Sequence, residues 1–124
     1  MWNFKKKNPN YEVLNKTILD LKTEKKFNLV LCKGVLIHVN PKQLMKTYKK
    51  IYNLSNRYIL IAEYFNPNPI KIKYRNFKNK LFKRDFAFEI MQSYKNLKLL
   101  DYGFVYHKDK HPLDNINWFL LKKN

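Results

Sequence analysis

Two side chains of this sequence, those of His38 and Glu63, have the chemistry to take a proton from a substrate. An imidazole titrates near neutral pH, which makes His38 a candidate general base. The alternative is that His38 is a loop histidine whose ring bonds a backbone carbonyl. Glu63 closes the apolar run at 58–62, so it meets a substrate if that run is a strand that ends at a ligand-binding edge. Together they predict general acid–base catalysis.

Arginine is scarce in this chain, which makes its positions informative. Of the 26 basic residues only Arg57, Arg75 and Arg84 are arginines, and the others are lysines. A guanidinium binds a carboxylate through two parallel hydrogen bonds, so Arg75 and Arg84 suit an acidic substrate such as an acidic sugar. Arg84, followed by Asp85, also fits an ordinary charged pair at the start of a helix.

Several common site chemistries are absent from the sequence. Cys32 is the only cysteine, which excludes a disulfide framework and a cysteine metal cage. The histidines, His38, His107 and His111, lack metal-ligand spacing, so we expect no metal site. Gly34 and Gly103 are the only glycines, and no phosphate-binding glycine loop and no nucleophile–base triad is present.

The net charge of +17 comes mainly from lysines that are spread along the chain, with Lys5, Lys6 and Lys7 as the only triplet. The chain is also rich in Asn and Ile and poor in Ala and Gly, which is typical of an AT-rich genome. We therefore interpret the charge as compositional drift on a solvated surface, with a weak, salt-sensitive attraction to polyanions. The alternative is a basic nucleic-acid-binding module, although such modules usually use arginine forks and a clustered basic stripe.

The length and composition predict one packed domain over residues 1–124. Hydrophobic residues make up 45% of the chain and aromatic residues 16%, which is enough for a core. No apolar run approaches the roughly 18 residues that span a bilayer. The first ten residues are polar and basic, unlike a secretory signal, so we expect a cytoplasmic location.

Apolar patterning predicts the strands and helices that position these residues. Residues 27–32 form a nearly continuous apolar run, as in a strand buried on both faces of a parallel sheet. Asn40 followed by Pro41 is a strong helix start, and apolar residues then follow at helical spacing as far as Tyr52. With a second buried strand at 58–64, this gives one right-handed βαβ unit.

Shorter elements flank this unit. Residues 11–14 read as a short strand that pairs with the edge of the 27–32 strand. After the break at 66–69, the stretch to residue 80 is predicted to be irregular, and a second helix follows at 83–94. Strands at 97–106 and 116–121 are joined by a short loop, so they must be antiparallel.

The residues that carry a family resemblance lie in stretches at 27–30, 34–41, 58–64, 66–67, 74–75, 81–87, 101–107 and 118–121. These stretches resemble the second half of a class I S-adenosylmethionine-dependent methyltransferase, and most closely the methylases associated with pseudaminic acid biosynthesis. The fold implied is α/β, the C-terminal half of a Rossmann-like methyltransferase fold. Its sheet is mostly parallel, ends in an antiparallel strand pair and lacks the first two strands of the family.

The resemblance also implies a cofactor, S-adenosylmethionine, and methyl transfer to oxygen or nitrogen of a small-molecule sugar. The residues that it places at the cofactor are Asp20, Cys32, Lys33 and Gly34. Those that it places at the substrate are Tyr64, Arg75, Arg84 and His107, with His38 and Glu63 as the catalytic pair. Two of these have open alternatives, since Asp20 also fits a solvated turn and Gly34 an ordinary turn glycine.

The sequence departs from the family where the cofactor is normally held. Class I methyltransferases begin with a strand and a glycine-rich turn, followed by an acid for the ribose, and neither is found here. We therefore expect a gene fragment, or a split enzyme in which a partner chain supplies the first half; an inactive remnant of the fold is the alternative. We also expect no measurable S-adenosylmethionine binding by this chain alone at micromolar concentration.

Overall fold

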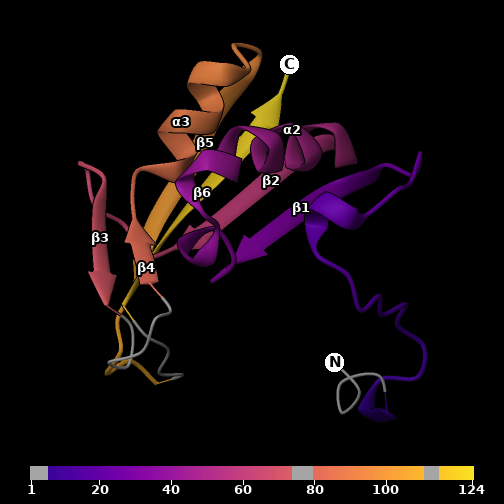
Figure 1. Ribbon diagram of the computed structural model, residues 1–124, viewed down its shortest axis with the longest axis horizontal. Helices are drawn as coiled ribbons and strands as arrows, with labels where there is room; N and C mark the ends of the chain where they lie inside the picture. The colour runs from indigo at the N-terminus through magenta and orange to yellow at the C-terminus, as the bar shows by residue number, and fades with distance from the viewer. Residues whose placement is uncertain (1–5, 74–79, 111–114) are drawn as a thin grey trace.

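The computed structural model describes residues 6–73, 80–110 and 115–124, and its main element is a four-stranded sheet (Figure 1). The strand order is β1 (Phe27–Lys33), β2 (Ser55–Glu63), β6 (Ile116–Lys123), β5 (Leu97–Val105). β1 and β2 are parallel, and β6 is antiparallel to both β2 and β5. The expected α/β sheet with a terminal antiparallel pair is thereby confirmed, with β1, β2 and β5 running in one direction and β6 in the other.

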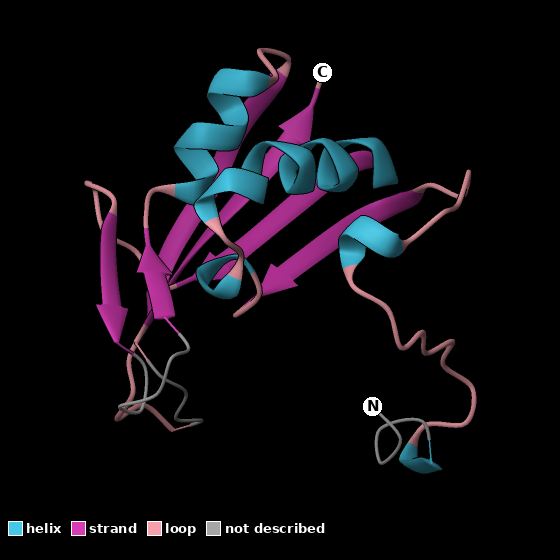
Figure 2. Ribbon diagram, in the orientation of Figure 1, coloured by secondary structure: helices cyan, strands magenta, loops and turns pink. Residues whose placement is uncertain are grey.

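Two helices cover one face of this sheet (Figure 2). Asn40 accepts a hydrogen bond from the Lys42 amide at 3.0 Å and, with Pro41, starts the 3-10 turn η3 (Pro41–Gln43), which leads into α2 (Leu44–Leu54). Asp85 caps α3 (Phe86–Ser93) by accepting from the Phe88 amide at 3.1 Å. Each cap satisfies an amide that has no partner inside its helix.

The core lies between these helices and the covered face of the sheet. Its fully buried side chains come from both layers: Leu36, Tyr48, Ile51, Ile59, Ile90 and Leu121. On the opposite face Leu29 and Leu31 are 51% and 56% exposed. No described helix packs on that face, so the sheet has one buried and one bare apolar side.

A two-stranded antiparallel hairpin, β3 (Ile70–Lys73) with β4 (Lys80–Lys83), lies beyond the carboxyl ends of β1 and β2 (Figure 1). The prediction of an irregular stretch here was therefore wrong for residues 70–73. The alternating Ile70 and Ile72 form a strand because Ile72 pairs with Leu81, whose side chain is buried. Because β4 extends to Lys83 and Asp85 is the N-cap, α3 begins at Phe86, three residues after the predicted start at 83.

The predicted strand at 11–14 is also wrong. Those residues form no strand, and Tyr11 is 60% exposed on a segment that runs away from the sheet (Figure 1). No described strand pairs with these residues, so extending them would gain no ladder hydrogen bonds to offset the entropy of ordering them. The segment joins the body at the 3-10 turn η1 (Ile18–Asp20), which packs against α2.

Candidate functional site

The carboxyl ends of β1 and β2 meet at one edge of the sheet, where open α/β sheets bind ligands. Gly34 turns the chain there with a left-handed φ of 64°, and its amide donates to the carbonyl oxygen of Ala62 at 3.0 Å. A Cβ placed on Gly34 would meet no atom within 4 Å. The backbone at Gly34 is therefore open to close approach by another molecule.

Glu63 fastens the loop that follows Gly34. Its Oε1 accepts hydrogen bonds from the amides of Val35 at 2.7 Å and Leu36 at 2.5 Å, at the start of η2 (Leu36–His38). The side chain is only 3% exposed, and its Oε2 has no hydrogen-bond partner among the described residues. One carboxylate oxygen thus ties β2 to the loop after β1, and the other is buried without a partner.

Burial shifts the acidity of two groups at this edge. It raises the pKa of Glu63 to about 7, against the opposing effect of the surrounding backbone amides. Burial, and then the charge of Glu63, raise the pKa of Cys32 to about 12. Glu63 is therefore partly protonated at neutral pH, whereas the Cys32 thiol stays neutral and is a poor nucleophile.

Some of the residues predicted from the sequence are brought together here. Glu63, Tyr64 and Arg84 line one gap that is too narrow to admit a water molecule. Cys32 and Gly34 lie at the end of β1, where Cys32 pairs with Ile61 and the Gly34 amide bonds the carbonyl of Ala62, the residue before Glu63. This edge is therefore closed on the core side and exposed at Gly34.

The other predicted residues do not line that gap. Lys33 and His38 are exposed, one at the end of β1 and one at the end of η2. Asp20 is exposed on η1, where its Oδ2 accepts from the Thr17 hydroxyl at 2.9 Å. His107 follows β5, and its amide donates to Oδ1 of Asn115 at 2.9 Å. Arg75 lies outside the described residues.

Glu89, which the sequence analysis did not single out, orients Arg84. Its Oε2 accepts from Nε of Arg84 at 2.9 Å, and its Oε1 accepts from the Tyr48 hydroxyl at 2.7 Å. Burial and the hydrogen bond to Glu89 raise the pKa of Tyr48, which keeps the phenol protonated as a donor. One signal for Glu89 was present in the sequence. Acidic residues are scarce, with only nine in the chain, and this one lies beside the buried Ile90 on α3.

Arg84 also lines an open cleft of about 510 Å³ between η3 and the β3–β4 hairpin. The lining residues are Asn40, Pro41, Lys42, Pro69, Ile70, Lys71, Phe82 and Arg84. Three are cationic and none is acidic, while the walls are largely apolar. Such a cleft suits a small molecule that carries a carboxylate or another anionic group.

Solved structures of methyltransferases share this fold. One is the Burkholderia thailandensis 1,6-didemethyltoxoflavin-N1-methyltransferase with bound 1,6-didemethyltoxoflavin and S-adenosylhomocysteine, at a TM-score of 0.75 and 14% identity, over 99% of this chain and 56% of that one. Another is a Clostridium acetobutylicum S-adenosylmethionine-dependent methyltransferase, with a TM-score of 0.61 and 12% identity, over 98% of this chain and 69% of that one. A third is the Synechocystis PCC 6803 magnesium protoporphyrin IX methyltransferase with bound S-adenosylhomocysteine, with a TM-score of 0.55 and 13% identity, over 90% of this chain and 50% of that one.

No protein-family model and no curated protein matches the sequence. The chain spans about half the length of solved structures that it matches, such as 56% and 50% of the Burkholderia and Synechocystis enzymes. At these identities the likeness shows the fold: a partial methyltransferase-type Rossmann-like sheet. Within the described residues no helix is long and apolar enough to cross a membrane.

Proposed function

We propose that this chain forms the C-terminal part of an S-adenosylmethionine-dependent methyltransferase that acts on a small, carboxylate-bearing acceptor. The observation that carries the proposal is the open carboxyl edge at Gly34, set beside the cationic cleft of Arg84. The solved structures with this fold include enzymes with bound S-adenosylhomocysteine, which supports the cofactor. Their acceptors differ, so the acceptor is inferred from the residues of this chain.

We propose that two residues at the edge, with Asp20 from η1, contact one side of the cofactor. Gly34 offers an unobstructed backbone, Lys33 is exposed beside it, and Asp20 presents a carboxylate from η1. The cofactor, when bound, supplies an electrophilic methyl group. We assign Cys32 a packing role beneath it, because its buried thiol stays neutral. A glycine-rich turn is absent from this chain, so a further segment or a partner chain would complete the site.

The Arg84 cleft supports an anionic acceptor. Glu89 holds Nε of Arg84, which fixes the guanidinium plane and prepares it for a planar carboxylate. Lys42 and Lys71 add positive charge on the same cleft. Within this class we propose a carboxylated sugar of the nonulosonic acid type, such as one in pseudaminic acid biosynthesis, methylated on oxygen or nitrogen.

Proton removal from the acceptor falls to His38 in this proposal. His38 is exposed at the end of η2, on the loop that Glu63 fastens. Glu63 itself is occupied by two backbone amides, so we propose that it positions this loop rather than touching the acceptor. Tyr64 and His107 remain proposed acceptor contacts, as does Arg75.

A titration of the ¹⁵N-labelled chain with S-adenosylhomocysteine tests the cofactor side. We expect amide shift changes at 18–20 and 32–38, with a dissociation constant on the order of millimolar, because the polar contacts of the glycine turn, worth about 1–3 kcal/mol each, are missing. Asp20→Asn should weaken binding, whereas Asp101→Asn, an exposed acid on β5, should not. Shift changes spread over the whole sheet, or micromolar affinity, would contradict the proposal.

The acceptor side needs a separate probe. N-acetylneuraminic acid, a nonulosonic acid, and its uncharged methyl ester are compared by saturation-transfer NMR. We expect the acid to bind and the ester not to, and Arg84→Gln to abolish binding of the acid. Arg57→Gln removes an exposed arginine on β2 and is the matched control. Equal binding of acid and ester would refute carboxylate recognition and leave the cofactor side untouched.

A further inference from the structure

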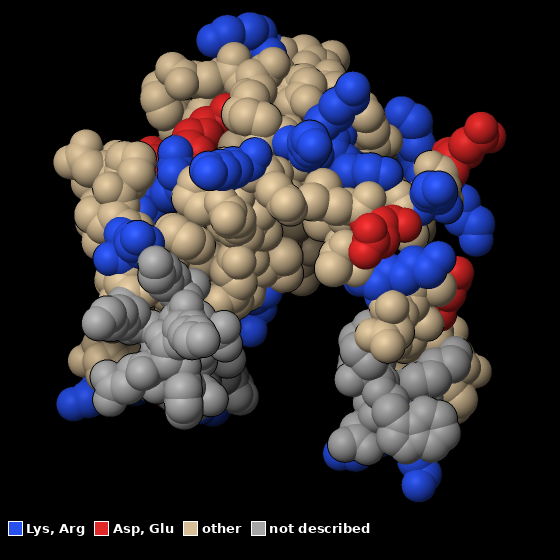
Figure 3. Space-filling model, viewed as in Figure 1, with Lys and Arg blue, Asp and Glu red and all other residues tan. Residues whose placement is uncertain are grey.

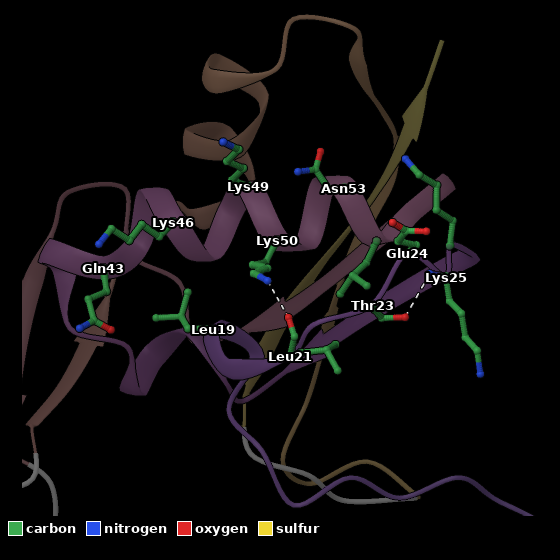
Figure 4. Close-up of a pocket in the computed structure, with 12 residues that line it drawn as sticks. Leu19, Leu21, Thr23, Glu24, Lys25, Gln43, Lys46, Lys49, Lys50 and Asn53 are labelled. Atoms are coloured by element: carbon green, nitrogen blue, oxygen red, sulfur yellow. Dashed lines mark hydrogen bonds between the residues drawn. The ribbon is translucent and has the colours of Figure 1, made fainter.

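A second cleft, of about 650 Å³, runs along α2 opposite the segment that precedes β1 (Figure 4). Gln43 lies at one end of it and Leu54 at the other, so it follows the whole helix. Its residues are distinct from those at the Gly34 edge and from those of the Arg84 cleft. Its volume falls within the range of clefts that bind small molecules.

Lysines dominate the lining of this cleft. They come from both walls: Lys25, Lys26, Lys46, Lys49 and Lys50, with Glu24 as the only acid. In Figure 4, Lys50 reaches across from α2, and its Nζ donates to the carbonyl oxygen of Leu21 at 2.6 Å. Figure 3 shows the same concentration of basic side chains over α2. The lining therefore takes lysines from two elements, of which Lys50 crosses the cleft while Lys25 and Lys49 point away from it in Figure 4.

This arrangement carries an electrostatic cost in the free chain. Lys46, Lys49 and Lys50 stand three and four residues apart on one helix, where like charges destabilise the helix. No ion pair joins Lys26 or Lys46 to any described residue. A bound anion would replace this repulsion by attraction.

Three leucines in the lining, referred to below as the leucine floor, add apolar surface to the cleft. Leu19 and Leu21 come from the segment before β1, and Leu54 closes the end of α2. A simple inorganic anion would leave these leucines exposed to water. A ligand that fits both parts carries phosphate groups and an aromatic or apolar portion.

We propose that this lysine-lined cleft is a binding site for a small phosphorylated organic molecule, with phosphates at the lysines and the apolar portion over the leucines. The cleft shares η1 with the proposed cofactor side, because Leu19 lies next to Asp20, and is otherwise distinct from the Gly34 edge and the Arg84 cleft. Binding would be salt-sensitive, since its ion pairs are exposed. The net charge of +17 attracts any polyanion, so the test must separate the cleft from the overall charge.

Calorimetry at low ionic strength, without divalent cations, compares ATP with tripolyphosphate. We expect ATP to bind more tightly than tripolyphosphate, because only ATP covers the leucine floor. The double variant Lys26→Gln/Lys46→Gln removes one charge from each wall and should weaken ATP binding about tenfold. Lys95→Gln/Lys98→Gln lowers the net charge equally at exposed positions outside the cleft and should leave ATP binding within about twofold.

Two results would overturn the proposal. Equal weakening by the two double variants would mean that ATP is attracted by net charge alone. Equal affinity for ATP and tripolyphosphate would mean that the leucine floor takes no part. Both variants replace exposed lysines, and a thermal melt of each verifies that the fold is intact.

Discussion

The two faces of the four-stranded sheet are lined by similar side chains and differ in what lies over them. On the covered face, Ile59, Ile61 and Leu121 are at most 1% exposed beneath α2 and α3. On the bare face, Leu29 and Leu31 of β1 remain about half exposed. A continuous apolar run predicts burial on both faces, and the described residues bury one. The covered face therefore stabilises the chain, while the bare face is available for association.

The largest expected effect is a loss of stability on the covered face. Ile59→Ala should lower the free energy of unfolding by about 4 kcal/mol, because it leaves a cavity in a fully buried site. Leu31→Ala, on the bare face of the neighbouring strand, should change it by no more than about 0.5 kcal/mol. Urea unfolding followed by circular dichroism measures both. Equal losses would show that the bare face is buried in solution.

The next largest effect tests whether the Glu63 carboxylate is shielded from water on the covered face. Its pKa is about 7 in the folded chain and 4.5 as the ordinary value, so the folded state holds this proton more tightly. Stability should therefore fall as pH rises from about 5 to about 8, by about 2–3 kcal/mol. Glu63→Gln keeps an oxygen for the Val35 and Leu36 amides and should remove that slope. Asp101→Asn, with an exposed side chain, is the control; a slope that survives Glu63→Gln would refute the assignment.

A smaller effect is expected where Trp118 lies over Gly103 on the bare face. A Cβ at Gly103 would come within 2.5 Å of the Trp118 ring. Because no described helix packs on this face, the indole can move aside, and Gly103→Ala should cost only about 1 kcal/mol, at the lower end for overpacking. Tryptophan fluorescence in a Trp2→Phe background should shift to the red. A cost above about 3 kcal/mol would mean that something holds the indole down.

The smallest effect on stability is expected from polar substitutions of the exposed leucines. Leu29→Asn/Leu31→Asn should reduce binding of a hydrophobic dye while changing the unfolding free energy by no more than about 0.5 kcal/mol. Met45→Asn/Phe88→Asn removes two apolar side chains that are exposed on the helices and is the matched control. Equal loss of dye binding in both variants would mean that the dye does not bind preferentially to the bare face.

Much of the sheet was predictable because its signals are local. The runs at 27–32 and 58–64 became β1 and β2, and Asn40 with Pro41 began a helix as expected. The errors came from pairing, which is not local. Residues 11–14 have strand-like composition but pair with no described strand, whereas residues 70–73 became a strand because they pair with β4, where Ile72 meets Leu81.

The site was predictable in its location and less so in its contacts. The carboxyl edge at Gly34 and Glu63 follows from parallel strands that end together. That Glu63 would bind the amides of Val35 and Leu36 depends on the path of a loop, which residue types do not specify. Glu89 was missed for the same reason, because its partners Arg84 and Tyr48 lie on different elements.

The outer edge of β1 has a consequence for how the molecule behaves as a colloid. β1 pairs only with β2, so among the described residues one row of its backbone amides and carbonyls faces no strand, and such a row is a template for another chain. Mutual repulsion at +17 holds copies apart, with a range of about 10 Å in 0.1 M salt and about 3 Å in 1 M salt. Dilute electrolyte thus keeps neighbouring edges out of reach, while concentrated electrolyte brings them within contact distance.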